Sequence, residues 1–430
     1  MTLDRSKQPP FSPPDDVTMP VSEAVATTNG IELHTLNSGE SELIRLSLVF
    51  RAGSSWQAQP FQASAALGML NQGTNLHSAA AIAEKLDFYG SIYDVNIDRD
   101  YTVVTICSLS KFFGPTVELL EEILLHPAFP EHELAVYADR RKAALSIERG
   151  KVAYRARELF TEALFGAKHP YGVFSQAAGY DKLDPVLLRD FYTRRYTAEN
   201  CFAVGSGLIS GKEISAMEAL LSKIPSAPQS RSDERKFPVI KKNPYVYIEQ
   251  EGAVQSAIRI GRVMFPRTHP DYIDMQVLCT VLGGYFGSRL VSNLREEKGY
   301  TYGVFAAMVN MEKSGYMAIG TEVGAQFTEA AVAEIFREIG RLREEAIPGE
   351  ELRIVKNMIT GELMRLLDGP FGIADITIEN IQNGTGNSYL DRFVHEVNAI
   401  TPAHLQTLAR RYLDPREFTT VIVGKKQGEI

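Results

Sequence analysis

An arginine and a tyrosine stand seven residues apart in residues 283–304, a stretch with the pattern of a glycine loop, a short helix and a strand. Arg295 is predicted late in the helix, and Gly299 after it suits the left-handed conformation that ends a helix. A strand is predicted from Tyr300, which places Tyr302 near its start. The two side chains could therefore converge, and a guanidinium beside a phenol hydroxyl suits a peptide carbonyl or a developing oxyanion. Spacing alone favours a plainer alternative, a surface arginine and a tyrosine at the edge of the core.

The common spaced motifs of hydrolytic and nucleotide-binding sites are absent from the sequence. There is no H-E-x-x-H, H-x-x-E-H, G-x-S-x-G or Walker A pattern, and zinc on a helix needs two imidazoles four residues apart. His132 and His395 each precede a glutamate, but the position four residues on holds valine after the first and alanine after the second. His126 and His169 adjoin prolines and are interpreted as structural. The histidines therefore predict no metal in this chain.

Composition limits the classes of protein to which the chain can belong. It has 430 residues, 44% hydrophobic and 23% charged, enough for two or more domains with cores. The net charge of −8 argues against a nucleic-acid binder or an anionic-membrane surface. The sequence has neither a signal-peptide core nor an apolar run long enough to span a membrane. The three cysteines lie far apart and suit a reducing compartment. We therefore expect a soluble cytoplasmic protein without nucleic-acid or membrane partners.

The elements that would position the arginine and the tyrosine occur in a pattern that is repeated along the chain. The helix predicted after Pro130 has a counterpart after Pro348, an offset of 218 residues (348 − 130). The strand at 202–205 is matched by 421–424, an offset of 219, and residues 44–51 are matched with 258–265. We interpret this as a tandem duplication, with two pseudo-symmetric α/β domains. Strands in hairpins and helices in blocks favour an α+β fold, with helices packed on mostly antiparallel sheets.

Four segments follow from these patterns. Residues 1–24 form a proline-rich arm that we expect to be extended. Residues 25–228 and 245–430 are predicted as the two domains. The stretch between them, 229–244, is polar, charged and proline-containing, which is typical of a linker. Within the first domain, residues 61–71 are predicted as an apolar helix that ends before a Gly-Thr pair.

The arrangement over residues 25–425 resembles the insulinase–pitrilysin family of zinc peptidases, in particular the subfamily that includes mitochondrial processing peptidase and bacterial relatives. Residues 49–74 resemble the family's strand, Ala-Gly-Ser, active helix and Gly-Thr, and residues 165–172 resemble the loop after its ligand helices. Residues 282–304 resemble its glycine loop and the Leu-Arg-Glu-Lys-x-Gly-x-x-Tyr block, which is the most specific match. The resemblance implies one half of a clamshell.

The family's active helix carries H-x-x-E-H, and this chain departs from it at each position. The two histidine positions fall on Ser64 and Gly68, and the glutamate position falls on Leu67. Serine and glycine cannot replace imidazole at zinc, and leucine cannot act as a general base. The register of the family's third ligand gives Ala144, and the nearest carboxylate, Glu148, is interpreted as a solvated charge at a helix end.

The second half of the chain keeps what the family places opposite its zinc site. There, an arginine and a tyrosine seven residues apart hold the substrate carbonyl, and Arg295 and Tyr302 match them. The resemblance thus reverses the preference that spacing alone gave. Gly283, Gly284 and Gly287 would let the backbone approach the peptide or a partner chain closely.

The resemblance implies a non-catalytic subunit of a two-chain zinc peptidase. A homologous partner with an intact H-x-x-E-H would hold the zinc, and this chain would need no cofactor. Arg295 and Tyr302 would orient the carbonyl of a peptide substrate and stabilise the oxyanion. A second hypothesis is a catalytically dead homologue that acts as a peptide-binding or structural assembly protein, possible as a homodimer when isolated, with that pair idle. An independent zinc peptidase with a rearranged site is disfavoured by the inventory of ligands.

Overall fold

The structure is a computed structural model of the chain. It describes residues 6, 20–38, 41–173, 176–227, 237–238, 240, 242–386 and 389–426. Most of the predicted arm (1–24) and most of the predicted linker (229–244) lie outside the described residues. In the described part, no helix combines the length and apolar character needed to cross a membrane.

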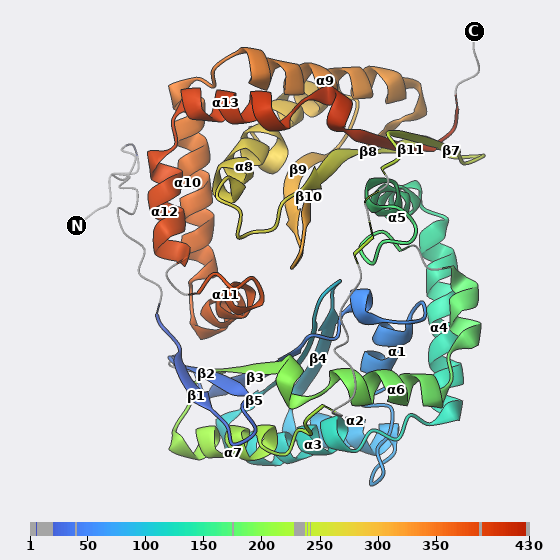
Figure 1. Cartoon of the computed structure of the whole chain (residues 1–430), viewed down its shortest axis with the longest axis vertical. Helices are drawn as coiled ribbons and strands as arrows, with labels where there is room; N and C mark the ends of the chain where they lie inside the picture. The colour runs from blue at the N-terminus through green and yellow to red at the C-terminus, as the bar shows by residue number, and fades with distance from the viewer. Residues whose placement is uncertain are drawn as a thin grey trace.

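Two mixed sheets form the centres of the two halves (Figure 1). In each sheet one neighbouring pair of strands is parallel, β2 with β6 and β7 with β11, and the other pairs are antiparallel. The first sheet has the order β1 (Glu23–Ala26), β2 (Glu32–Asn37), β6 (Cys201–Gly207), β3 (Leu43–Phe50), β5 (Thr102–Leu109) and β4 (Ile92–Ile97). The second has the order β7 (Tyr245–Glu249), β11 (Thr419–Gly424), β8 (Gln255–Met264), β10 (Gly315–Gly324) and β9 (Val304–Asn310).

Helices pack on these sheets in both halves, and the predicted α+β class with two related units is confirmed. The first half contains α1 (Gln62–Gly68), α2 (Ala79–Tyr89), α3 (Phe113–Leu125), α4 (Glu131–Arg149), α5 (Val152–Phe165), α6 (Pro185–Arg195) and α7 (Gly211–Leu221). The second contains α8 (Tyr272–Cys279), α9 (Thr328–Glu344), α10 (Gly349–Leu366), α11 (Pro370–Gln382), α12 (Tyr389–Ala399) and α13 (Pro402–Tyr412).

The internal repeat has the predicted helix starts but a different strand register. Helices α4 and α10 both begin directly after a proline, Pro130 and Pro348, as the offset of 218 residues requires. In the sheets, Leu48 pairs with the strand that contains residues 202–205, and Ile258 takes the equivalent place beside 421–424. The β3–β8 offset is therefore 210 residues (258 − 48), and the predicted match of 44–51 with 258–265 was wrong by four. Apolar alternation of period two fits every even shift equally well, so the pattern could not fix the register.

Two helices cross between the halves. Helix α5, from the first half, covers the second sheet, where Ala156 is fully buried beside Ala257 and Val423. Helix α11, from the second half, lies against the first sheet (Figure 1), where Arg45 of β3 pairs with Asp375 at 2.7 Å. Each sheet is therefore completed by a helix from the other half. The predicted domain boundaries at residues 228 and 245 stay a prediction.

Candidate functional site

The arginine–tyrosine segment folds as a widened helix followed by a turn. The helix spans Val291–Glu297 with a π-type bond from the Lys298 N–H to the Asn293 carbonyl oxygen at 3.0 Å. Gly299 has φ of 65° and ends the helix as predicted. The strand prediction was wrong at its start, because β9 begins only at Val304. The Thr301 hydroxyl lies within hydrogen-bond distance of the carbonyl oxygens of residues 303 and 322 and can donate to either of them.

The structure places Arg295 and Tyr302 on the surface. The Arg295 guanidinium carbon lies 4.9 Å from the centre of the Phe286 ring, a cation–π contact that orients it. Tyr302 is 92% exposed, and no hydrogen bond joins it to Arg295. Neither residue lines the cavity between the two halves. That both side chains bind one carbonyl oxygen therefore stays a prediction. A ligand that they share must approach from outside this chain's own cavity.

The glycines of the preceding loop mainly serve internal packing. Gly283 is buried, and a Cβ there would lie 2.7 Å from the Ala306 backbone nitrogen of β9. A Cβ on Gly287 would meet the Tyr285 ring at 2.9 Å. Gly284 and Gly287 are exposed. Gly283 thus permits a close approach of the loop to strand β9 of the same chain, while Gly284 and Gly287 remain accessible to a partner.

Helix α1, which carries the positions of the family's zinc motif, is shorter than predicted. It spans Gln62–Gly68 and ends in turns, and the residue before it, Phe61, has the left-handed φ of 65°. The Phe61 ring stacks on Tyr180 with centroids 3.9 Å apart, which helps to fix this unusual backbone. Leu67 is 2% exposed and belongs to the core of the first half. The residue that the resemblance matches to the general base is therefore a packing residue.

A tyrosine ring from helix α4 packs against α1 at Gly68. The Tyr137 hydroxyl donates to the Ser64 carbonyl oxygen at 3.1 Å, and a Cβ on Gly68 would lie 2.8 Å from the Tyr137 Cε2 atom. Burial raises the pKa of Tyr137, although the nearby Arg141 acts in the opposite direction. Tyr137 therefore remains a neutral phenol that occupies the place between the two helices.

The third ligand position is equally unsuited to zinc. Ala144 is exposed on α4, and Glu148 pairs with Lys151 at 2.6 Å near the helix end, in line with its interpretation as a solvated charge. Within the described part of the chain, no three His, Cys, Asp or Glu side chains come close enough to hold a metal ion. The residues in the described ranges therefore do not fit a zinc site.

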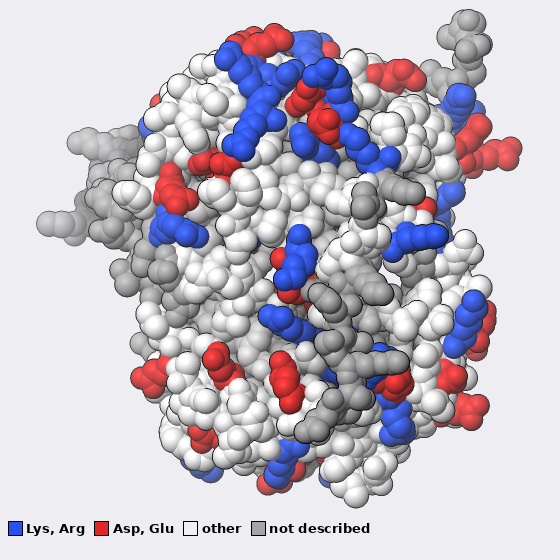
Figure 2. Space-filling model, viewed as in Figure 1, with Lys and Arg blue, Asp and Glu red and all other residues white. Residues whose placement is uncertain are grey.

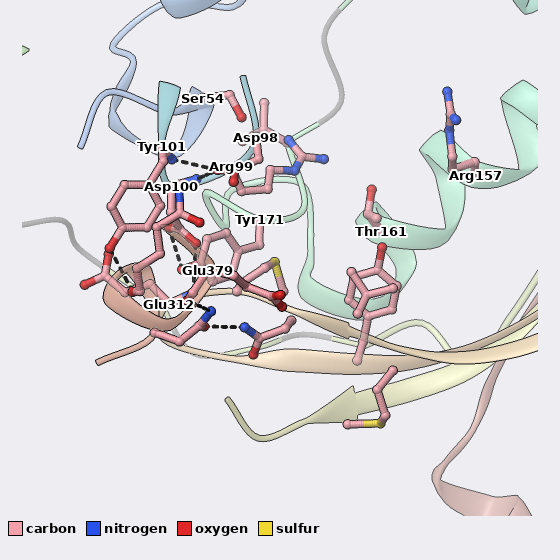
Figure 3. A pocket seen from close by; sticks show the side chains of 18 of the residues that line it. Ser54, Asp98, Arg99, Asp100, Tyr101, Arg157, Thr161, Tyr171, Glu312 and Glu379 are labelled. Atoms are coloured by element: carbon pink, nitrogen blue, oxygen red, sulfur yellow. Dashed lines mark hydrogen bonds between the residues drawn. The ribbon is translucent and has the colours of Figure 1, made fainter. Parts of the chain in front are cut away.

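A cavity of about 810 Å³ lies between the two halves (Figure 3). Ser64 of α1 is part of its wall, together with the β4–β5 turn, helix α5 and the β9–β10 hairpin. The walls combine aromatic and charged side chains, as ligand-binding cavities commonly do. This cavity was not predicted, because no local pattern reports which loops of the two halves will meet.

Asp100 joins the two halves at the edge of this cavity. The carboxylate is 3% exposed and accepts hydrogen bonds from the Tyr171 hydroxyl at 2.9 Å and from the Glu312 N–H at 2.8 Å. His169, two residues before the tyrosine, is buried, and its Nδ1 accepts the Tyr171 N–H at 3.1 Å. Burial lowers the pKa of His169, which favours the neutral imidazole that this hydrogen bond requires. The loop at 165–172 thus supports the contact between the halves.

The surface charges show no large field of one sign on the face seen in Figure 2. Lys and Arg side chains gather with Asp and Glu over α9 and α13, and elsewhere the two signs are interspersed. Surface ion pairs follow the same pattern, for example Arg353 with Glu350 on α10. Such pairs contribute little to stability.

Comparisons with known proteins agree with this architecture. A family profile described as "Insulinase (Peptidase family M16)" matches residues 46–168, and one described as "Peptidase M16 inactive domain" matches residues 182–359. A solved structure from Pseudomonas fluorescens, titled as a peptidase M16 inactive domain, superposes with a TM-score of 0.86 at 23% identity, over 95% of this chain and 99% of that one.

Curated relatives carry two kinds of name. The "Uncharacterized zinc protease YmxG" of Bacillus subtilis is 23% identical over 80% of this chain and 83% of its own length. The "Non-peptidase homolog YmxG" of Helicobacter pylori is 20% identical over 89% of both chains. The two profiles together span most of the residues from the first sheet to helix α10, and the chain belongs to the insulinase family of peptidases, M16.

Proposed function

We propose that this chain is the non-catalytic subunit of a two-chain zinc peptidase. Two observations support the proposal: a tyrosine ring packs against the residues matched to the family's zinc ligands, and the arginine and tyrosine matched to its carbonyl-binding pair are exposed. Tyr137 occupies the space beside Ser64 and Gly68, whereas Arg295 and Tyr302 face solvent. A homologous partner with an intact H-x-x-E-H would supply the metal, and no cofactor is expected here.

The surface around Arg295 has the composition of a protein interface. Phe286 is 64% exposed, Tyr302 92% and Phe305 45%. Aromatic residues and arginine dominate binding energy at interfaces, and exposed apolar patches on a folded domain commonly mark contact sites. The loop and strand β9 touch directly at Gly283, so these side chains lie on neighbouring elements.

The chemical role of the pair follows from its hydrogen-bond donors. The Arg295 guanidinium and the Tyr302 hydroxyl would donate to the oxygen of the scissile carbonyl and to the oxyanion that forms from it. Donors placed where negative charge develops lower the barrier, and removal of one typically costs about 100- to 1,000-fold in kcat. The Phe286 ring would hold the guanidinium in place through the cation–π contact at 4.9 Å.

The test mixes this chain with the product of a neighbouring gene that encodes H-x-x-E-H, and follows cleavage of a fluorogenic peptide. We expect Arg295→Ala to lower kcat of the mixture by about 100-fold or more without preventing association. Arg353→Ala, which removes an exposed arginine elsewhere on α10, is the matched control and should leave the rate unchanged. Equal activity of the partner alone, or an unchanged rate with Arg295→Ala, would refute the proposal.

A second function, peptide binding without cleavage in an assembly with itself, is favoured by the cavity of about 810 Å³ within the single chain. In that case the isolated chain would bind peptides, and Arg295→Ala would not alter any hydrolysis. The name "Non-peptidase homolog" of the Helicobacter pylori relative is compatible with both functions. For either function we propose a cytoplasmic location.

A further inference from the structure

The cavity between the halves contains two arginines from different elements. Arg99 lies in the turn between β4 and β5, and Arg157 lies on α5. Figure 3 shows Arg99 extending from the turn toward the side of the cavity formed by α5. Each arginine is thus presented by a backbone element that is itself fixed by packing between the halves.

The carboxylates in the same wall already have partners. Glu158 pairs with Arg149 at 3.3 Å, Glu312 with Lys313 at 3.3 Å, and Glu379 with Arg267. Asp98 accepts two backbone N–H bonds at 2.6 Å, and Asp100 binds the hairpin of the other half. The acidic side chains are therefore part of the fold and do not neutralise the two arginines directly.

The two arginines have no such partners. Among the described residues, neither Arg99 nor Arg157 forms an ion pair or a side-chain hydrogen bond, although Arg157 lies 5.0 Å from the Tyr154 ring centre. Arg99 is only partly exposed, and burial lowers its pKa, although the nearby Tyr316, Asp100 and Asp98 oppose this. Arginine stays charged even so, and a partly buried charge that forms no direct ion pair is costly.

Tyr316 of β10 lines the same cavity as the two arginines. Burial raises the pKa of Tyr316, and the positive charges of Arg99 and Arg157 act in the opposite direction. The hydroxyl is a further donor in the same wall of the cavity. Two guanidiniums and a phenol therefore line one cavity from three different elements.

We infer that Arg99 and Arg157 form a carboxylate-binding subsite in the cavity, which holds an acidic side chain or the C-terminal carboxylate of a bound peptide. The choice of a peptide as the ligand rests on the proposed function. A guanidinium presents a planar fork of donors that matches a carboxylate. The neighbouring Asp98 and Asp100 favour a ligand with one negative charge over one with two, such as a phosphate monoester.

The test measures fluorescence anisotropy of labelled peptides with the isolated full chain. Three otherwise identical peptides carry a central glutamate with an amidated C-terminus, a central glutamine with an amidated C-terminus, and a central glutamine with a free C-terminus. We expect at least one carboxylate peptide to bind about tenfold or more tightly than the uncharged peptide. Tighter binding of the glutamate peptide identifies an acidic side chain as the ligand. Tighter binding of the peptide with the free C-terminus identifies the terminal carboxylate. Either result supports the subsite.

Substitutions then assign the preference to the arginines. Arg157→Gln and Arg99→Gln should each reduce the carboxylate preference to about twofold or less, and Arg353→Gln should preserve it. Arg157 is exposed, so its variant keeps the test usable if the partly buried Arg99 cannot be replaced without unfolding. Equal binding of all three peptides, an unchanged preference in Arg157→Gln, or no saturable binding up to about 1 mM would overturn the inference.

This result is separable from the test of the proposed function. Binding is measured on the chain alone, whereas the subunit role is measured as hydrolysis by the mixture. If the carboxylate preference is present but the mixture is no more active than the partner, only the subunit role fails. If the mixture is active and sensitive to Arg295→Ala but the peptides bind equally, only the subsite fails.

Discussion

Replacing Gly68 by alanine tests whether Tyr137 occupies the place of a zinc-binding side chain. The added Cβ would lie 2.8 Å from Tyr137 Cε2, and the ring is restrained because its hydroxyl donates to the Ser64 carbonyl oxygen at 3.1 Å. Such overpacking costs about 1–3 kcal/mol, whereas alanine gains up to about 1 kcal/mol over glycine in a helix. We expect a net loss of about 1–2 kcal/mol in the free energy of unfolding.

The same substitution should behave differently once the ring is gone. In a Tyr137→Ala background the added methyl meets no ring, so Gly68→Ala should be neutral or stabilising by up to about 1 kcal/mol. The coupling between the two positions is then about 2 kcal/mol, large enough for a double-mutant cycle. Urea unfolding of the four chains, followed by the fluorescence of Trp56, measures it. Trp56 is the single tryptophan and lies just before α1, so its signal reports on the first half.

Two outcomes would refute this reasoning. Equal destabilisation in both backgrounds would show that the alanine meets something other than Tyr137. No destabilisation in the native background would show that the space beside Gly68 is open. The same geometry predicts that Ser64→His combined with Gly68→His acquires no zinc affinity while Tyr137 remains, which calorimetric titration with zinc can check.

Three further predictions concern the contacts that hold the fold around the site. Burial alone would raise the pKa of Glu122, but hydrogen bonds from Thr74 and His77 outweigh it, so the pKa falls below its usual 4.5. Glu122→Gln should therefore cost about 1.5–3 kcal/mol at pH 7, and the difference in urea midpoint should vanish as acid protonates the native carboxylate below that value. Asp100→Asn should cost a similar amount and speed hydrogen exchange in the 311–314 turn, because it weakens bonds between the halves. Gly283→Ala should lower the thermal midpoint, because its Cβ would lie 2.7 Å from a backbone nitrogen of β9.

Matched substitutions control for the nature of each change. Gly340→Ala in α9 adds a Cβ that meets nothing within 4 Å, so it should be neutral or stabilising. Asp139→Asn removes a carboxylate that is 79% exposed, and it should leave the unfolding curve unchanged. Destabilisation by either control as large as that of its partner variant would contradict the assignment of the effect to the contact.

Helix boundaries could be predicted from the sequence where a single residue determines them. Pro130 and Pro348 begin α4 and α10 because proline has no N–H to lose at a helix start. Gly299 ends the π-type helix because its φ of 65° is open to glycine without strain. These are local effects, and they were sufficient to reveal the repeat and the α+β class.

What could not be predicted depends on contacts between distant segments. Tyr137 lies on a helix far along the chain from Ser64, and nothing in its local pattern indicates that its ring fills the metal position. The packing of α5 and α11 on the sheet of the other half could not be predicted either, because the pattern of an amphipathic helix does not specify which sheet it covers. Arg99 and Arg157 meet one cavity only because this packing brings their elements together.

The exposed aromatic surface is the feature that the two proposed functions explain differently. Both proposed functions would cover the exposed Phe286 and Tyr302, either with a homologous partner or with a second copy. In a two-fold homodimer, each Arg295 would face a copy whose zinc position is filled by Tyr137. Such a dimer could hold a carbonyl but could not hydrolyse the bond. An H-x-x-E-H partner that displaces the homodimer and gains hydrolysis would therefore favour the subunit role, and an inert homodimer that persists beside that partner would favour peptide binding alone.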